Sequence, residues 1–119
     1  MSSGIQIENI TPVLGVKILE RSKTFYVDAL GFSVDWGFEE GHVVGSVSRD
    51  GKSFMLSEGE ASGMTCWVGV EDILPFYERL KSLGIEIVQE PTNQWWAYEF
   101  RALDPDGNIL WFGSEPLPE

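Results

Sequence analysis

Basic residues are scarce in this 119-residue sequence, and histidine and cysteine each occur only once. Eight Lys and Arg stand against 19 Asp and Glu, which gives a formal net charge of −11 at pH 7. Recognition of nucleic acid depends on clustered Lys and Arg side chains, so this balance argues against such a partner. An acidic cleft would raise the local concentration of cationic ligands. A charged, solubilising surface explains the same balance equally well.

The lone cysteine, Cys66, excludes an intramolecular disulfide and is compatible with a reducing compartment. It lies in the strand-like stretch Met64-Thr65-Cys66-Trp67-Val68 with no base nearby, so we expect a buried structural thiol. No window approaches about 18 consecutive apolar residues, and the N-terminus lacks a basic segment followed by an apolar run. We therefore expect a soluble, cytoplasmic protein.

Apolar residues make up 43% of the sequence and aromatic residues 13%, enough to build a core. Alternating and helical apolar patterns predict strands over residues 10–16, 32–39, 42–48, 52–57, 64–70, 85–89, 95–103 and 109–112, and helices over 19–30 and 72–83. Gly31 is a plausible residue just after the first helix, and Asp72 a plausible N-cap of the second. Pro91 is expected to end the strand 85–89, and residues 92–94 to form a loop.

The two halves of the sequence repeat one pattern. Leu30-Gly31-Phe32 corresponds to Leu83-Gly84-Ile85, and Asp50-Gly51 corresponds to Asp106-Gly107. Each half reads as a strand, a helix and three strands, which predicts an α+β domain, residues 1–119, of two βαβββ modules. The modules span about residues 9–57 and 64–114 and are joined by a linker over residues 58–63. Because modules of about 50 residues are too small to bury a face alone, we expect their concave faces to combine into a half-barrel cleft.

Several short motifs carry a resemblance to a known family. They are Thr11-Pro12-Val13-Leu14, Phe25-Tyr26, Leu30-Gly31-Phe32, and Trp95 with Glu99-Phe100 before Asp104-Pro105-Asp106-Gly107-Asn108. In this order and spacing the sequence resembles the vicinal oxygen chelate superfamily, which includes glyoxalase I, extradiol dioxygenases, and fosfomycin and bleomycin resistance proteins. The Thr11 stretch and the Trp95 loop are most similar to the bleomycin-resistance branch. The resemblance extends from about Ile10 to Ser114.

The metal enzymes of this superfamily carry His, Gln or Glu ligands on the first and last strand of each module. The corresponding positions here are Thr11, Leu56 (give or take one residue), Thr65 and Trp111. Threonine, leucine and tryptophan are poor ligands for a divalent ion, and His42, which begins a middle strand, is far from these positions. The resemblance therefore implies a relative with no metal and no other cofactor.

Strand parity predicts what lines the cleft instead. If Thr11, Leu56, Thr65 and Trp111 face it, then Val13, Gly15, Phe54, Trp67 and Ile109 do so too. The opposite phase, with Leu14, Val16, Leu110 and Phe112, suits packing under the helices. We also place Trp36, Phe38, Trp95 and Glu99 among the ligand-binding candidates, Glu99 to meet a ligand cation unless Arg101 neutralises it. The full candidate set is Thr11, Trp36, Phe38, Phe54, Leu56, Thr65, Trp67, Trp95, Glu99 and Trp111.

No general base, nucleophile or oxyanion-binding group can be assembled from these residues. Aromatic faces bind flat rings by stacking and cations by quadrupole attraction. The sequence thus favours a metal-free, non-catalytic binder of a cationic aromatic small molecule. The resemblance implies a homodimeric antibiotic-resistance protein for a bleomycin-type glycopeptide. Two alternatives stay open: a metal-dependent lyase, dioxygenase or thiol transferase of the superfamily, and an accessory protein that needs no ligand.

Overall fold

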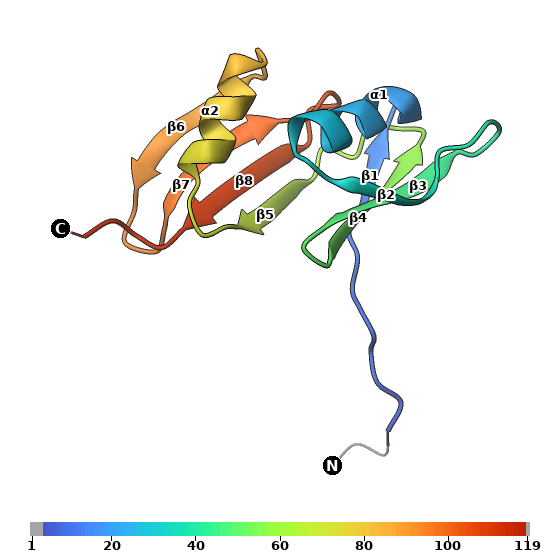
Figure 1. Ribbon diagram of the computed structural model, residues 1–119, viewed down its shortest axis with the longest axis horizontal. Coiled ribbons are helices and arrows are strands. Elements are labelled where there is room, and N and C mark those ends of the chain that lie inside the picture. Colours follow the sequence, from blue (N-terminus) through green and yellow to red (C-terminus); the bar gives the residue numbers. More distant parts are fainter. Residues whose placement is uncertain (1–3, 119) are drawn as a thin grey trace.

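The computed structural model describes residues 4–118, which form two modules, each with a four-stranded sheet and a helical segment (Figure 1). The ends of the predicted domain, residues 1–3 and 119, lie outside the described residues. In chain order the elements are β1 (Val13–Val16), α1 (Leu19–Thr24), the π-helix η1 (Phe25–Ala29), β2 (Ser33–Gly37), β3 (Val44–Arg49), β4 (Lys52–Glu58), β5 (Thr65–Gly69), α2 (Leu74–Ser82), β6 (Ile87–Asn93), β7 (Tyr98–Leu103) and β8 (Ile109–Ser114).

Both sheets have the same topology. Sheet A has the strand order β1-β4-β3-β2 and sheet B the order β5-β8-β7-β6. In each sheet the first strand of the module pairs in parallel with its last strand, and the other pairs are antiparallel. The predicted α+β fold of two βαβββ modules is therefore confirmed. None of the helices in the described part of the chain has the length and apolar character needed to cross a membrane.

The core lies between each sheet and its own helical segment. Leu14 on β1 pairs with Leu56 on β4, and both side chains are fully buried. In sheet B the rings of Phe100 and Phe112 stack with their centroids 4.8 Å apart. The faces of the two sheets that point away from the helices are here called the open faces.

On strand β4 the structure differs from the expected orientation of Leu56 by one residue, within the tolerance stated for that position. Phe54 and Leu56 lie in the core, 8% and 0% exposed, whereas Met55 pairs with Val13 on the open face. Side chains of paired residues on neighbouring strands point to the same side of a sheet, so the register with β1 decides the orientation. The sequence does not reveal that register, because both phases of β4 contain large apolar residues.

The first helix widens along its length. Its α-helical part gives way to the π-helix η1 at Phe25, and Gly31 follows the helix with φ 75°, as predicted. The π-helical turn brings Tyr26 into the core, fully buried, where its hydroxyl donates a hydrogen bond of 2.9 Å to Asp104 of the second module. Burial, and then the neighbouring Asp104, raise the pKa of Tyr26 well above its usual value.

The turn between β7 and β8 connects the second module to the first. The fully buried carboxylate of Asp106 accepts hydrogen bonds from the backbone N–H of Lys17 (3.0 Å), the guanidinium of Arg21 (2.8 Å) and the hydroxyl of Ser22 (3.2 Å). We call these four residues the latch. It fixes the start of α1 against the second module.

The other end of the same helical segment is held in a similar way. Arg79 of α2 donates hydrogen bonds to the backbone carbonyls of Asp28 (2.7 Å) and Ala29 (3.2 Å), at the end of η1. Cations suit the carbonyl-rich C-terminal end of a helix. Since both ends of the first helical segment are tied to the second module, the two modules are held side by side.

Two further boundaries differ from the predictions. Strand β6 continues through Pro91 to Asn93 because it is an edge strand, where a missing N–H leaves no neighbour unpaired. At the N-terminus the strand begins only at Val13. The segment before it runs away from both modules (Figure 1), with Ile5, Ile7 and Ile10 80–99% exposed. Helix α2 begins at Leu74, whose N–H donates to the side chain of Asp72.

Candidate functional site

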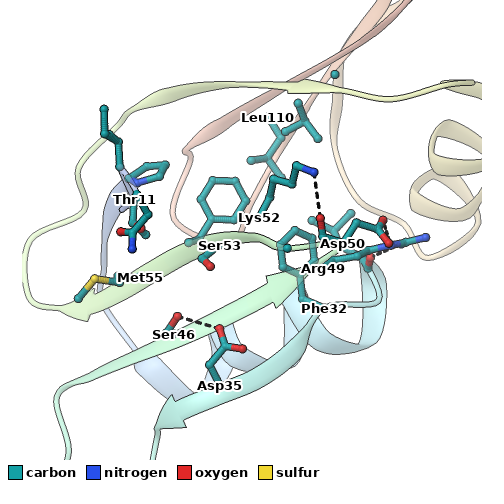
Figure 2. A pocket seen from close by; sticks show the side chains of 18 of the residues that line it. Thr11, Phe32, Asp35, Ser46, Arg49, Asp50, Lys52, Ser53, Met55 and Leu110 are labelled. Atoms are coloured by element: carbon teal, nitrogen blue, oxygen red, sulfur yellow. Dashed lines mark hydrogen bonds and ion pairs between the residues drawn. The ribbon is translucent and has the colours of Figure 1, made fainter. Parts of the chain in front are cut away.

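A pocket of about 910 Å³ lies between the two modules, within the size range typical of small-molecule sites. The first module contributes Phe32, Asp35, Trp36, Ser46, Arg49, Lys52, Phe54 and Met55, the preceding segment contributes Glu8 to Pro12, and the second module contributes Trp67, Val68, Gly69, Val70, Phe76, Leu110 and Phe112. Figure 2 shows this pocket, with Thr11, Met55 and the Ser46–Asp35 pair on one side and Leu110 on the other. We call it the inter-module pocket.

The wall from the first module is polar at its base. The carboxylate of Asp35 accepts hydrogen bonds from the hydroxyls of Ser46 (2.9 Å) and Ser48 (2.6 Å), across the β2–β3 pair. Trp36, next to it, is 49% exposed. Three other charged side chains belong to this wall: Arg49 donates to the carbonyl of Leu30, Lys52 donates to the carbonyl of Asp50, and the Asp50 carboxylate lies 3.6 Å from Arg49 (Figure 2).

The wall from the second module combines the rings of Trp67, Phe76 and Phe112 with aliphatic side chains, and Trp111 lies next to it in contact with Trp67. Trp67 on β5 pairs with Trp111 on β8, and their rings meet edge to face with centroids 5.1 Å apart. The Trp67 ring lies against Gly113, where an added Cβ would come within 2.0 Å of the ring. Gly113 is therefore required for this ring position, and it leaves Trp67 51% exposed. We call Trp67, Trp111 and Arg101, whose guanidinium lies 4.3 Å over the Trp111 ring, the tryptophan face.

A buried carboxylate supports the tryptophan face from below. Glu99 on β7 is 1% exposed, and its two oxygens accept hydrogen bonds from Gln89 (3.0 Å) and from the indole of Trp96 (2.7 Å). Arg101 lies 3.9 Å from it. Burial alone would raise the pKa of Glu99. The hydrogen bonds from Gln89 and Trp96, the nearby Trp111 indole and the Arg101 charge together lower that pKa below its usual value.

The indole N–H of Trp111 is a special case. Its nitrogen is buried and makes no hydrogen bond with any residue of the described chain. It lies close enough to Glu99 to favour the charged carboxylate, but not in hydrogen-bond geometry. Buried polar groups without a partner are rare in proteins and call for an explanation.

The predicted site residues fall into three groups. Thr11, Trp36, Phe54 and Trp67 line the inter-module pocket, and Trp111 adjoins it through Trp67. Thr65 lies exposed beside this group, at the start of β5. The remaining predicted residues, Phe38, Leu56, Trp95 and Glu99, do not line the pocket.

Each residue outside the pocket has a structural reason for its place. Leu56 is in the core, and Phe38 packs its ring against Gly45. Trp95 is 85% exposed and stacks edge to face with Trp96. Glu99 is enclosed, with both oxygens engaged, so it supports its neighbours and has no exposed surface to offer a cation.

Sequence reasoning missed much of the site, including the Asp35–Ser46 pair of the pocket wall and, around the tryptophan face, Arg101 and Gln89. Met55 was covered only by the one-residue tolerance given for Leu56, and Arg101 was considered only as a neutraliser of Glu99. Gln89 was not considered, because the strand was expected to end there. A β-bulge between Ile87 and Gln89 turns Gln89 toward Arg101. No sequence signal announces such a bulge.

The residues present do not fit the divalent metal of the superfamily's enzymes. Among residues 4–118, no group of three or more His, Cys, Asp and Glu side chains is arranged to hold a metal ion. The four positions corresponding to the usual ligands are Thr11, Leu56, Thr65 and Trp111. Leu56 faces the core, and the carboxylate of β4, Glu58, accepts a hydrogen bond of 2.8 Å from the backbone N–H of Leu19. We derive no chemistry through a metal.

Comparison with known proteins places this geometry in a family. The family model for the Glyoxalase/Bleomycin resistance protein/Dioxygenase superfamily matches residues 7–112. The chain belongs to this superfamily. None of the curated proteins matches the sequence.

Solved structures of this superfamily's fold resemble the chain over most of its length. TnmS3, an antibiotic binding protein from Streptomyces sp. CB03234, superposes with a TM-score of 0.81 at 22% identity, covering 96% of this chain and 100% of TnmS3. TioX from Micromonospora sp. ML1 has a TM-score of 0.82 at 16% identity, covering 91% of this chain and 98% of TioX. The integron cassette protein HFX_CASS4 from the mobile metagenome of Halifax Harbour sewage outfall has a TM-score of 0.78 at 26% identity, covering 91% and 99%. At such identities these likenesses show the shared fold.

Proposed function

We propose that the protein binds a small molecule with a flat aromatic ring system and does no chemistry on it. The observation that carries this proposal is the tryptophan face, beside a pocket of about 910 Å³ that holds a second exposed indole, Trp36. Rings stacked on exposed indoles gain about 0.5–1.5 kcal/mol each beyond the area they bury. Among the described residues that line the pocket there is no histidine and no cysteine, the most common general base and the most reactive nucleophile of enzymes.

The comparisons support a ligand of the antibiotic class. TnmS3 is described as an antibiotic binding protein, and the superfamily includes bleomycin resistance proteins. A bleomycin-type glycopeptide has flat rings and positive charge, and the net charge of −11 would attract such a ligand at long range. Sequestration of this kind would protect a cell without catalysis.

A homodimer completes the proposal. The radius of gyration is 15.6 Å, larger than the roughly 13–14 Å expected for a compact domain of this length. The modules lie side by side, so their open faces are not covered by one another, and the N-terminal segment exposes Ile5, Ile7 and Ile10. A second copy would cover these surfaces and enclose the ligand. Light scattering should then give twice the 13.3 kDa of one chain.

Calorimetric titration with copper-free and copper-loaded bleomycin tests the proposed function. We expect micromolar or tighter binding, and a loss in affinity of at least about 2–13-fold for Trp67→Ala, which corresponds to the stacking energy of one indole. Val88→Ala, at a site 46% exposed on the edge strand β6, serves as a surface control. A flat trace would remove bleomycin as the ligand. A stoichiometric divalent ion bound by the purified protein would favour the enzyme alternative.

A further inference from the structure

We propose that Arg101 donates a hydrogen bond to an acceptor on the edge of the bound ring system. The tryptophan face would then bind rings that carry a carboxylate, phenolate or similar oxygen more tightly than rings that carry an amine. This inference rests on the proposed function and specifies the ligand class of the same site. It differs from the expectation of a cationic ligand, which came from the net charge, the aromatic rings and Glu99.

Arg101 has unused donors. One nitrogen of its guanidinium, Nη1, donates to the side chain of Gln89 and lies 3.9 Å from Glu99. Within the described chain, its other two nitrogens donate to no protein acceptor. The side chain is 33% exposed, so a ligand can reach part of it. A planar guanidinium with free donors matches carboxylates and similar oxygen pairs.

Arg101 is also held in place. Its guanidinium lies 4.3 Å over the ring of Trp111, and Gln89 fixes one end. Glu99, in turn, holds Gln89 and Trp96. A group already fixed in its binding geometry loses less side-chain entropy when a ligand arrives. Arg101 is therefore better suited to recognise a ligand group than a mobile charged side chain on the surface would be.

The face has more free donors than free acceptors. Of the described strand residues on the open face of sheet B, the charged ones are Glu99 and Arg101, and Glu99 is 1% exposed with both oxygens engaged. A ligand amine would meet the positive charge of Arg101 with no carboxylate to receive it, whereas a ligand oxygen would be received.

The net charge of −11 does not decide this selection. At physiological salt, exposed charges separated by more than about 8 Å are largely screened. A ligand group in contact with Arg101 lies well inside that distance. The acidic surface therefore affects how fast a charged ligand approaches, while Arg101 affects which ring edge is retained.

Three matched probes test the inference on the full-length protein at 0.15 M salt: anthraquinone-2-carboxylate, anthraquinone-2-carboxamide and 2-(aminomethyl)anthraquinone. Binding is followed by quenching of tryptophan fluorescence. We expect affinity to fall from carboxylate to carboxamide to amine. Arg101→Gln should weaken carboxylate binding about tenfold or more, as expected for loss of a charged hydrogen bond, and should not weaken amine binding.

Two further variants complete the experiment. Lys81→Gln removes the same charge from the far side of the sheet, where Lys81 is 62% exposed on α2 beside Tyr77, and should leave the order and the affinities unchanged. Arg101→Lys keeps the positive charge but loses the planar guanidinium that can donate two hydrogen bonds to one carboxylate. Its affinity for the carboxylate probe should lie between those of the parent protein and Arg101→Gln. Unfolding midpoints confirm that each variant is folded. Equal binding of the three probes, a preference for the amine, or an unchanged order in Arg101→Gln overturns the inference alone. No quenching by any probe overturns the proposed function and this inference with it.

Discussion

The latch offers the sharpest test of how the two modules are joined. In Asp106→Asn an amide replaces a fully buried carboxylate that accepts from Lys17, Arg21 and Ser22. The charge is lost, and one acceptor becomes an NH₂ group facing other donors. A hydrogen bond to a charged group contributes about 1.5–3 kcal/mol. The Arg21 side chain is 43% exposed, which places its share at the lower end. We expect a loss of about 2–3 kcal/mol in the free energy of unfolding.

Urea unfolding followed by tryptophan fluorescence measures this loss. Asp50→Asn is a matched control, because Asp50-Gly51 is the corresponding turn of the first module and its carboxylate is 85% exposed. Asp50 has φ 53°, a conformation that Asn tolerates well, so we expect a change within about 0.5 kcal/mol. The slope of the unfolding free energy against urea concentration should be the same in both variants, since unfolding exposes the same surface area. Equal effects of the two substitutions would refute the role of the latch.

Three further predictions concern buried groups. Cys66 is 8% exposed, and its burial, together with the nearby Asp104, raises the pKa of its thiol. Labelling of this thiol by DTNB should therefore be far slower in the native protein than in urea. Equal labelling rates would contradict this. Because the folded-state pKa of Glu99 is lowered, its charged form stabilises the fold above the ordinary Glu pKa of about 4.3, and this contribution is lost as pH falls through the lower folded value. The difference in unfolding free energy between the parent protein and Glu99→Gln should therefore shrink below about pH 4.3, and a constant difference would argue against it. In Gly113→Ala the new Cβ would meet the Trp67 ring, so the ring must move. We expect the protein to stay folded but the ligand to quench tryptophan fluorescence less. Undiminished quenching would mean that ligand binding does not depend on this ring position.

Much of the fold was predictable from local patterns. Alternation placed most strands, and the repeat of Leu-Gly and Asp-Gly motifs predicted two equivalent modules. The side of the sheet to which each side chain of β4 points was not predictable. Phe54, Met55 and Leu56 are all apolar, and only the pairing with β1 distinguishes them. The π-helix was also hidden, since its residues fit a regular amphipathic helix.

The site was harder to predict than the fold. Trp67 and Trp111 were found because their strands are short and regular, and parity places both on the open face. The burial of Glu99 depends on Trp96 and Gln89, which reach it from a loop and from a bulged edge strand. Trp95 and Trp96 are adjacent in sequence, so the pattern of apolar residues did not predict which of the two would pack inward. Long-range geometry of this kind is absent from a local pattern.

The most direct test of ligand binding at the tryptophan face uses the indole N–H signals of the five tryptophans in a ¹⁵N–¹H correlation spectrum, assigned by single Trp→Phe substitutions. During titration with anthraquinone-2-carboxylate, the signals of Trp67 and Trp111 should shift most, and the exposed Trp95 signal least. If the ligand binds but leaves Trp67 and Trp111 unmoved, the ligand site lies elsewhere and the account is contradicted.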